Sequence, residues 1–226
     1  MHVDDAIHSR KSVRRFLPDP VSRETVTHIL EVAGRAPSGS NIQPWKIHVV
    51  SGSVRERLSG AILAAFDAGT GEHQPEYHYY PQNWFEPYLS RRRRCGYGLY
   101  ESLGIQREDK QRRNKQARRN FLFFDAPIGM IVTIDRRLEA GSFMDTGMLI
   151  QSIMVAARGQ GLHTCAQAAF TWYHEIIRAQ LGLGDNELVL CAIALGHEDT
   201  EAPENHFITE RETVEAFATF HGFEST

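Results

Sequence analysis

The spacing of apolar residues along the chain predicts several amphipathic helices and a few separated strands. One helix follows Ser22, a plausible N-cap, and its apolar positions recur every three or four residues up to Gly34, a common helix stop. A β-branched run such as residues 128–134 is typical of a buried strand. We expect helices over residues 4–10, 22–34, 54–66, 144–157 and 172–181 and near 214–220, and buried strands over 45–50, 128–134 and 187–195. Because residues 144–157 are apolar on most sides, we interpret them as a buried central helix.

The middle of the chain has another pattern. Residues 68–84 are rich in Gly, His, Tyr and Pro and show no period, which predicts an irregular loop. From about residue 85 to 124 the sequence is polar and helical, and Gly96, Gly98 and Gly104 predict breaks in this region. We interpret residues 70–125 as an insertion of helices and loops.

Helices mixed with a few separated strands predict an α+β or α/β sandwich rather than a regular βαβ array. A length of 226 residues suits a single compact domain, residues 1–226, and 42% hydrophobic residues suffice for its core. Neither an internal repeat nor a low-complexity tract interrupts this organisation.

Charge and composition exclude several classes of protein. The formal net charge of -3 gives no general case for binding nucleic acid. No apolar run approaches the roughly 20 residues of a membrane span, and the polar start does not resemble a signal peptide. Three widely separated cysteines without a CxxC pair fit free thiols in the cytoplasm better than a disulfide framework.

The segment Arg10-Lys11-Ser12-Val13-Arg14-Arg15-Phe16 places four cations around a hydroxyl, directly after a short helix. Arginine offers a bidentate fork and serine a further donor, so the segment suits a phosphate group. A solvated basic turn would have the same composition, and the segment by itself does not decide between the two.

The loop Arg35-Ala36-Pro37-Ser38-Gly39-Ser40-Asn41-Ile42-Gln43-Pro44-Trp45 is a second candidate for ligand binding. Its small residues let backbone approach a ligand closely, and Asn41 and Gln43 offer both donor and acceptor groups. A structural loop would explain the Gly and Pro, but it does not require two amides and a Trp at the start of a strand.

Together the two motifs resemble the opening of the FMN-dependent nitroreductase family, with an Arg-x-Ser-x-Arg-x-Phe segment and a Pro-Ser-x-x-Asn-x-Gln-Pro-Trp loop one helix later. Residues 161–169, GLHTCAQAA, resemble the family's segment at the pyrimidine edge of the flavin. Residues 195–199 with Asn205 and Arg211 resemble its closing stretch. The 70–125 region, together with residues 121–127, is similar to the branch that acts on nitrobenzoates and related nitroaromatic compounds.

The resemblance implies a three-layer α-β-α sandwich, an intertwined homodimer with FMN at the subunit interface, and the 70–125 insertion over the active site. It implies that Arg10, Lys11, Ser12 and Arg211 hold the phosphate and ribityl chain, and that Arg14 lies near the flavin N1–O2 edge. Backbone amides of Gln167, Ala168 and Ala169 would face N5 and O4. The partner subunit would contribute Pro37, Ser38, Gly39 and Asn41.

Two residues depart from the family pattern. His197 stands where a tyrosine is usual, and His206 stands where an arginine often follows the asparagine. The second departure weakens the phosphate assignment at this end of the site and leaves Arg211 as the better candidate.

The implied activity is reduction of a small nitroaromatic compound by NAD(P)H through FMN, with ping-pong kinetics and no catalytic side chain, because the flavin N5 performs the chemistry. The sequence lacks the Gly-rich loops of tight nucleotide sites, so the nicotinamide would stack on the flavin only transiently. On the same fold, a quinone or flavin reductase, a flavin-fragmenting enzyme, a dehalogenase and a non-catalytic flavin-binding redox module remain alternatives.

Other conspicuous residues have less specific interpretations. His73 and His78 lie near Glu72 and Glu76, but their spacing matches no usual metal-ligand pattern, so we expect no metal. The run Arg91–Arg94 is typical of a solvated helix face. Our functional hypothesis is that one arginine from this run, or from those at 112, 113, 118 and 119, pairs with a substrate carboxylate. The aromatic residues of 77–88 could stack on a substrate, although packing of the insertion explains most of them.

Overall fold

The computed structural model describes residues 1–223. Its centre is a four-stranded sheet in the order β1-β2-β4-β3, in which every neighbouring pair is antiparallel. The strands are β1 (Trp45–Ser51), β2 (Ile128–Asp135), β3 (His163–Gln167) and β4 (Glu187–Gly196). In the part of the chain described, β1 and β3 therefore form the two edges.

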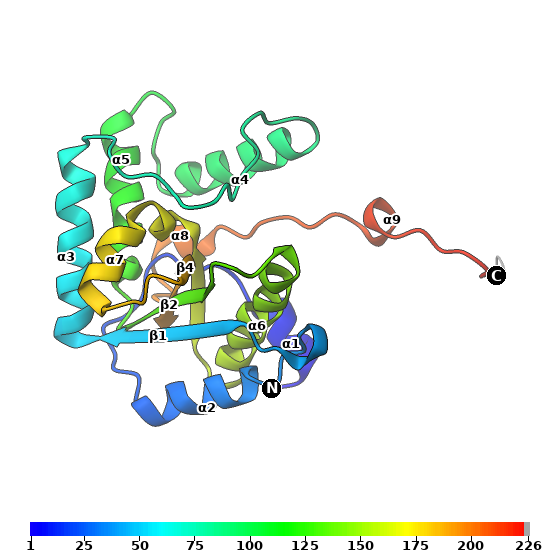
Figure 1. Cartoon of the computed structure of the whole chain (residues 1–226). Coiled ribbons are helices and arrows are strands. Elements are labelled where there is room, and N and C mark those ends of the chain that lie inside the picture. The colour runs from blue at the N-terminus through cyan, green and yellow to red at the C-terminus, as the bar shows by residue number, and fades with distance from the viewer. Residues whose placement is uncertain (224–226) are drawn as a thin grey trace.

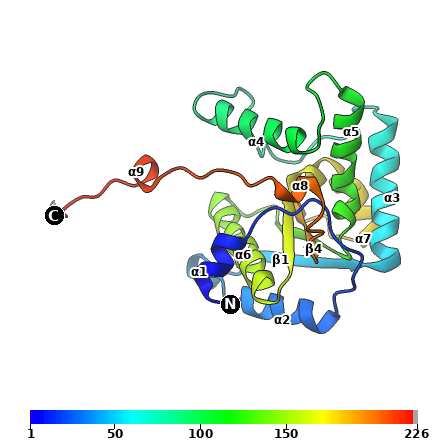
Figure 2. The ribbon, with the colours of Figure 1, turned by 180° about the vertical axis from the view of Figure 1, so that it is seen from behind.

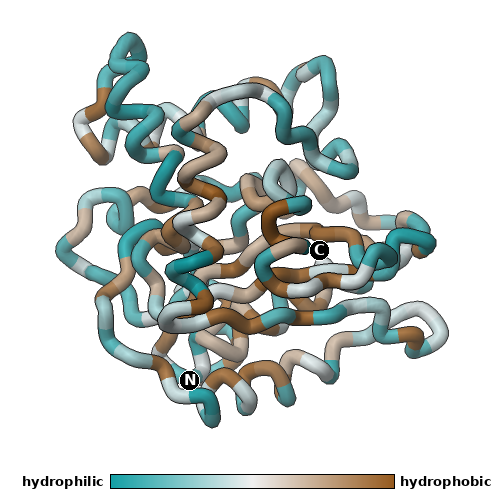
Figure 3. Tube along the Cα trace, turned by 60° about the vertical axis from the view of Figure 1, so that its left-hand side comes forward, coloured by the Kyte–Doolittle hydropathy of each residue, from teal (hydrophilic) through white to brown (hydrophobic). Residues whose placement is uncertain are grey.

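Helices cover both faces of the sheet (Figures 1 and 2). Because successive side chains of a strand point to opposite faces, Met130 and Val132 of β2 pack in one apolar cluster and Ile131 packs in the other. The first face is covered by α2 (Arg23–Ala33) and α6 (Ala140–Gly159), with α1 (Val3–Ser9) packed on α6, and the second by α3 (Gly52–Ala68), α7 (His174–Leu181) and shorter turns. The predicted three-layer sandwich is confirmed, and hydrophobic stretches run through its centre (Figure 3).

Local signals located the first helices correctly. The Ser22 side chain accepts a hydrogen bond from the backbone N–H of Thr25 at 3.0 Å, so Ser22 is the N-cap of α2. Gly34 is the C-cap of the same helix. The predicted helix at residues 172–181 begins at His174, after the 3-10 segment η3 (Ala168–Tyr173).

Two predictions about strands were wrong or incomplete. Residues 45–50 do form β1, but most of this edge strand is not buried, because a second strand lies on one side of it only. The short strand β3 was not predicted. Its five residues pair with β4 from His163↔Gly196 to Gln167↔Ala192, so the tertiary pairing creates this strand.

The predicted irregular loop is confirmed between α3 and α4 (Tyr88–Ser102). Contrary to expectation, α4 continues through Gly96 and Gly98. The helix ends at Ser102, just before Gly104, where φ is +60°. A Cβ on Gly98 would lie 2.3 Å from the ring of Phe207, so this glycine permits close packing instead of ending the helix. The helix α5 (Lys110–Arg118) and the turn η2 (Arg119–Asp125) follow.

The predicted central helix corresponds to α6, but it is buried on one side only. Leu149 and Ile153 pack in the core, whereas Met144 is 68% exposed. The expectation of burial on most sides was therefore wrong for this chain.

After α8 (Pro203–His206), residues 207–223 leave the body and extend away from it (Figures 1 and 2). The predicted helix near 214–220 is a single turn, α9 (Val214–Phe217). Phe217 on this arm is 73% exposed and Phe223 is 77% exposed. Such a short helix without a covering surface has few hydrogen bonds to stabilise it.

Candidate active site

A cavity of about 500 Å³ lies where β3 runs into η3. This volume is within the range of pockets that hold organic cofactors and substrates. Three separate parts of the chain surround it: the Arg14 segment, the loop before α4, and the turn η2. The lining residues are Arg14, Pro75, Tyr77, His78, Tyr79, Tyr80, Asn120, Phe124, Cys165, Ala166, Gln167, Ala168, Ala169, Thr171 and Trp172.

The basic segment after α1 runs beside β3. Ser12 forms an isolated parallel bridge with Thr164, and the N–H of Val13 donates to the Thr164 carbonyl at 3.1 Å. This pairing brings Arg14 to the cavity wall, where its guanidinium also donates to the Ser12 carbonyl at 3.2 Å. Arg10 is half-buried at the end of α1. The structure thus places Arg10, Ser12 and Arg14 on one strand-like segment leading to the cavity.

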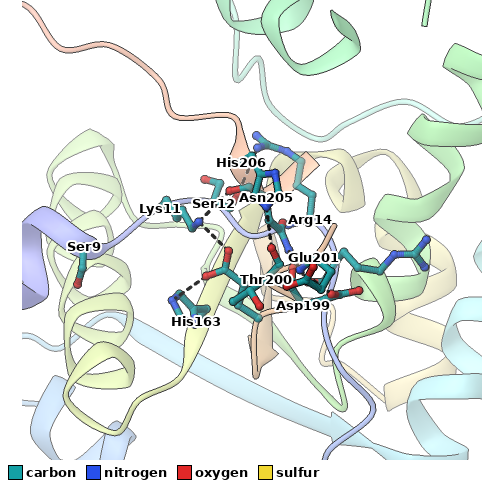
Figure 4. A network of polar contacts seen from close by, with 12 residues as sticks. Ser9, Lys11, Ser12, Arg14, His163, Asp199, Thr200, Glu201, Asn205 and His206 are labelled. Carbon is teal, nitrogen blue, oxygen red and sulfur yellow. Dashed lines mark hydrogen bonds and ion pairs between the residues drawn. The ribbon is translucent and has the colours of Figure 1, made fainter. Parts of the chain in front are cut away.

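Asn205 fastens this segment from the other end of the chain (Figure 4). Its side-chain oxygen accepts from the N–H of Arg14 at 2.7 Å. Its amide group donates to the carbonyls of Arg15 and Asp199, both at 2.8 Å. Because Asn205 is only 1% exposed, these three bonds hold the backbone of Arg14 in a dry environment.

Lys11 makes contacts within the protein that the sequence did not predict. Its ammonium group lies 2.6 Å from the Glu198 carboxylate and donates to the Asn205 carbonyl at 2.8 Å (Figure 4). Glu198 is nearly buried, so its charge needs this partner. A phosphate-binding role for Lys11 stays a prediction.

His163 borders the same network. Its Nε2 lies 3.1 Å from the second Glu198 oxygen, and its Nδ1 lies 3.4 Å from the Arg158 guanidinium. Burial, followed by the charge of Arg158, lowers the pKa of His163 to about 4. A neutral ring that donates from Nε2 to Glu198 and accepts from Arg158 at Nδ1 satisfies both contacts.

The strand β3 carries two buried polar atoms that lack partners, and one of them, on Gln167, lies at the cavity. Gln167 donates its amide to the Asn120 carbonyl at 2.8 Å, but its Oε1 has no hydrogen-bond partner. The Thr164 hydroxyl is also buried and unpartnered. Unsatisfied buried groups are uncommon, and next to a cavity they indicate a place where a polar ligand completes the hydrogen bonding.

The turn η2 approaches the cavity in an unusual backbone conformation. Phe123, Phe124 and Asp125 have φ of +53°, +54° and +72°. Each left-handed non-glycine residue costs about 1–3 kcal/mol, so the surroundings must stabilise the turn. The side chains of Arg15 and Arg119 bind the Asp125 carboxylate at 2.8 and 2.9 Å. Phe124 thereby becomes part of the cavity wall.

The second sequence motif lies elsewhere in this chain. Within the described residues, none of Pro37, Ser38, Gly39 and Asn41 lines the cavity. The buried carboxylate of Asp145 on α6 accepts from the N–H of Gly39 at 3.2 and 3.3 Å. This bond holds the loop, which includes the 3-10 turn η1 (Gly39–Asn41), against the start of α6.

Arg211 lies on the C-terminal arm, apart from the basic segment with which it was grouped. Its guanidinium donates to Thr209 and to the Glu210 carbonyl. It lines a groove between the arm and α4 together with Arg91 and Tyr88. Its assignment to the phosphate stays a prediction.

Most arginines of the run on α4 contact side chains of the same chain. Arg91 pairs with Glu212 at 2.9 Å, and Arg94 pairs with Glu210 at 2.5 Å. Arg92 lies 4.8 Å from the ring centre of Trp84. Among the described residues, Arg14 is the arginine on the cavity, and none of the arginines at 91–94, 112, 113, 118 and 119 lines it. This geometry adds no support to the substrate-carboxylate hypothesis.

Sequence reasoning did not assign several cavity residues. Asn120 and Thr171 carried no motif, Phe124 belonged to the family-like residues 121–127 without a place in the site, and Trp172 was predicted only as part of a helix. The aromatic cluster around Tyr77–Tyr80 was the one available signal. In residues 1–223, no group of three or more His, Cys, Asp or Glu side chains is arranged to hold a metal ion. No helix in this part of the chain is both long and apolar enough to cross a membrane.

A cavity of this size, with a cation on its wall and polar groups at its base, is suited to an organic cofactor. Comparison with known proteins is more specific. The model of the nitroreductase family matches residues 7–197. The chain therefore belongs to the nitroreductase family.

Relatives along nearly the whole chain agree. A nitrobenzene nitroreductase of Ectopseudomonas oleovorans is 42% identical over 96% of both chains. A 4-nitrobenzoate reductase of Nocardioides sp. (strain LMS-CY) is 39% identical over 96% of this chain and 89% of its own. The crystal structure of the FMN and NADPH-dependent nitroreductase NfnB from a Sphigopyxis strain, 38% identical, covers 99% of this chain and 100% of its own with a TM-score of 0.95.

Proposed function

We propose that this oxidoreductase uses FMN and a reduced nicotinamide nucleotide to reduce the nitro group of small aromatic compounds. The observation that carries the proposal is the cavity at the end of β3, which combines the Arg14 cation with the unpartnered buried oxygen of Gln167. Family membership and the activities printed for its relatives support the same conclusion.

The residues present fit FMN. Gln167 Oε1 lies at the cavity and needs a hydrogen-bond partner, and the polar edge of a flavin supplies such a donor. Arg10 and Ser12 would hold the phosphate, because they precede Arg14 on a segment that leads away from the cavity. Backbone groups of Gln167, Ala168 and Ala169 would orient the ring. Lys11 and Arg211 remain candidates for the phosphate end.

When bound, FMN supplies the hydride chemistry, accepting hydride from the nucleotide and donating it to the nitro compound. The protein contributes position and charge. Arg14, whose guanidinium lies on the cavity wall, would stabilise negative charge that develops on the ring. The nucleotide and the nitro compound would occupy the same cavity in turn.

We also propose that a homodimer completes the site. The loop at residues 37–41 is held on α6, away from the cavity of its own chain, and Asn41 on it is exposed. Met144 on α6 and Phe217 on the arm are exposed apolar side chains that a second copy would cover. A two-fold dimer would then contain two equivalent sites.

The remaining proposals concern organisation and location. We propose that the chain is a single domain in which the 70–125 region covers the active site. Support comes from Pro75, the residues Tyr77–Tyr80, Asn120 and Phe124, all of which line the cavity. We propose a cytoplasmic location, because Cys95, Cys165 and Cys191 are free thiols.

An anaerobic visible spectrum tests the function. Purified protein with FMN should show an oxidised flavin spectrum that NADPH or NADH bleaches and that nitrobenzene or 4-nitrobenzoate restores. Failure to bind FMN would reject the proposal. Bleaching without reoxidation by either nitro compound would retain the flavoenzyme and reject the substrate. Equal turnover of both compounds would remove the substrate-carboxylate hypothesis.

The dimer has its own test. Light scattering should give twice the chain mass, and Asn41→Ala should weaken FMN binding without altering the fold. A monomer that binds FMN tightly would contradict the shared site.

A further inference from the structure

The segment Pro75–Tyr80 forms one wall of the active-site cavity, although it belongs to an irregular loop. Tyr77, His78 and Tyr79 line this cavity on one side and a second cavity against α6 on the other. The segment is thus a partition between two spaces, and it is part of the connection between α3 and α4 (Figure 1). Its position must come from side-chain anchors, because no helix or strand includes it.

The first anchor is the carboxylate of Glu76. Its Oε1 lies 2.9 Å from the guanidinium of Arg136 and 3.8 Å from that of Arg178. Its Oε2 lies 3.4 Å from Nδ1 of His174. Arg136 follows β2, and the other two partners lie on α7. A single carboxylate of the loop therefore contacts two elements of the body.

The partners of Glu76 are themselves held in place. Arg136 donates to the carbonyls of Asp185 and Glu187 at 2.6 and 3.1 Å. Arg178 donates to the Glu187 carbonyl at 2.8 Å. These bonds orient both guanidinium groups toward the start of β4, so that they form a preorganised site for one carboxylate.

Because Glu76 is nearly buried, its ion pairs affect the stability of the loop more than exposed ion pairs would. The Glu76 side chain is 14% exposed, and its Oε2 is fully covered without a geometrically good hydrogen bond, as is Nδ1 of His174. A nearly buried carboxylate needs its cationic partners, since loss of one leaves a desolvated charge. An exposed ion pair would contribute far less.

The next residue supplies a second anchor. The hydroxyl of Tyr77 donates to the Leu190 carbonyl of β4 at 2.5 Å, and burial raises the pKa of this phenol. Its ring meets that of Phe143 edge-on at 5.5 Å. Beyond these anchors, Tyr79 and Tyr80 are each 57% exposed at the cavity. Their positions depend on the two residues that tie the segment down.

We propose that Glu76 is a positioning residue that, through Arg136, Arg178 and His174, holds the Pro75–Tyr80 wall in the conformation that binds the aromatic substrate. This inference rests on the proposed function. Glu76 lies outside the cavity lining, and so it acts through its neighbours Pro75 and Tyr77. Arg14, on the side of the cavity proposed for FMN, is not among the ion-pair partners of Glu76.

The test compares Glu76→Gln and Arg136→Gln with Arg137→Gln as the matched control. Arg137 is adjacent in sequence and pairs with Asp135 at 2.7 Å, but it does not contact Glu76. We expect both anchor variants to bind FMN normally and to raise KM for nitrobenzene about tenfold, with kcat changed less than threefold. Arg136→Lys, which keeps the charge, should restore most of the affinity.

The double variant and hydrogen exchange complete the test. If both residues act through one contact, the KM of Glu76→Gln combined with Arg136→Gln should be close to that of either single variant. Amide exchange of residues 70–87 should accelerate in the anchor variants and stay unchanged in Arg137→Gln.

Unchanged KM and unchanged exchange in soluble anchor variants would overturn the inference. Anchor variants that bind FMN weakly, with a lower kcat and a higher KM, would also overturn it, because such a uniform effect would indicate general unfolding. A wild-type protein that reduces no nitro compound would reject the proposed function instead, and amide exchange would still decide whether Glu76 holds the wall.

Discussion

The side chain of Asn205 joins the two ends of the chain at the active site, and its removal should have a calculable effect. Asn205 is 1% exposed and makes three side-chain hydrogen bonds, to the N–H of Arg14 and to the carbonyls of Arg15 and Asp199. In Asn205→Ala all three are lost, while the partner groups stay in place. Each such bond contributes about 1 kcal/mol, which predicts a loss of about 3 kcal/mol in the free energy of unfolding.

For a chain of 226 residues, this loss corresponds to a fall of about 6–12 °C in Tm. Asn205→Asp keeps the shape and the acceptor for Arg14, but it places one carboxylate oxygen against the carbonyls of Arg15 and Asp199. We therefore expect it to be at least as destabilising as the alanine variant. Urea denaturation at fixed protein concentration, monitored by circular dichroism, measures both.

Function should change along with stability, because the Arg14 backbone loses its acceptor. FMN fluorescence titration should show weaker binding in Asn205→Ala under conditions where the variant is still folded. The exposed residue Asn83 provides the control, and Asn83→Ala should change stability by less than about 0.5 kcal/mol. If Asn205→Ala had the same urea midpoint of unfolding as the wild type, the reasoning would be refuted.

Three further predictions concern packing and pH. A Cβ on Gly129 would lie 2.4 Å from the buried ring of Phe123, so Gly129→Ala should destabilise the protein by about 2 kcal/mol in thermal unfolding. Burial alone would raise the pKa of Glu187, but hydrogen bonds from Thr133 and His48 lower it to about 2. The contribution of ionised Glu187 to the free energy of unfolding is therefore complete above pH 4.5 and is lost toward pH 2. The stability difference between wild type and Glu187→Gln should therefore shrink between pH 5 and pH 3. The pKa of His163 is also lowered, so the contribution of its neutral form to the free energy of unfolding is complete above pH 6.5 and falls toward pH 4. His163→Gln should therefore reduce the change of the urea midpoint with pH between pH 6.5 and pH 4.

Much of the secondary structure followed from local signals. The cap at Ser22, the stop at Gly34 and the β-branched run of β2 each act over a few residues, and the structure confirms them. The errors occurred where a distant partner decides. Gly98 did not break α4 because Phe207, more than one hundred residues later, packs against it. The strand β3 forms because its backbone pairs with β4 through antiparallel hydrogen bonds.

The candidate site divides in the same way. Residues 10–14 could be proposed for a phosphate from their residue types, whereas residues 167–169 were assigned to the flavin through the family resemblance alone. Glu198 as the partner of Lys11 could not be predicted, since nothing in their spacing of 187 positions indicates contact. The anchoring role proposed for Glu76 was hidden for the same reason, because Arg136 follows β2 and Arg178 lies on α7, both far from Glu76 in the chain.

By itself, the sequence determined the family, the expected cofactor and the order of most helices and strands, because these depend on residue type and local spacing. Only the tertiary structure decided which side chains meet. It brought Arg14, Gln167 and Tyr77 to one cavity, and it separated Arg211 and the 37–41 loop from that cavity within the chain. The physical reason is that ion pairs and buried hydrogen bonds depend on distances of a few ångströms, and these are set by the packing of segments far apart in the chain.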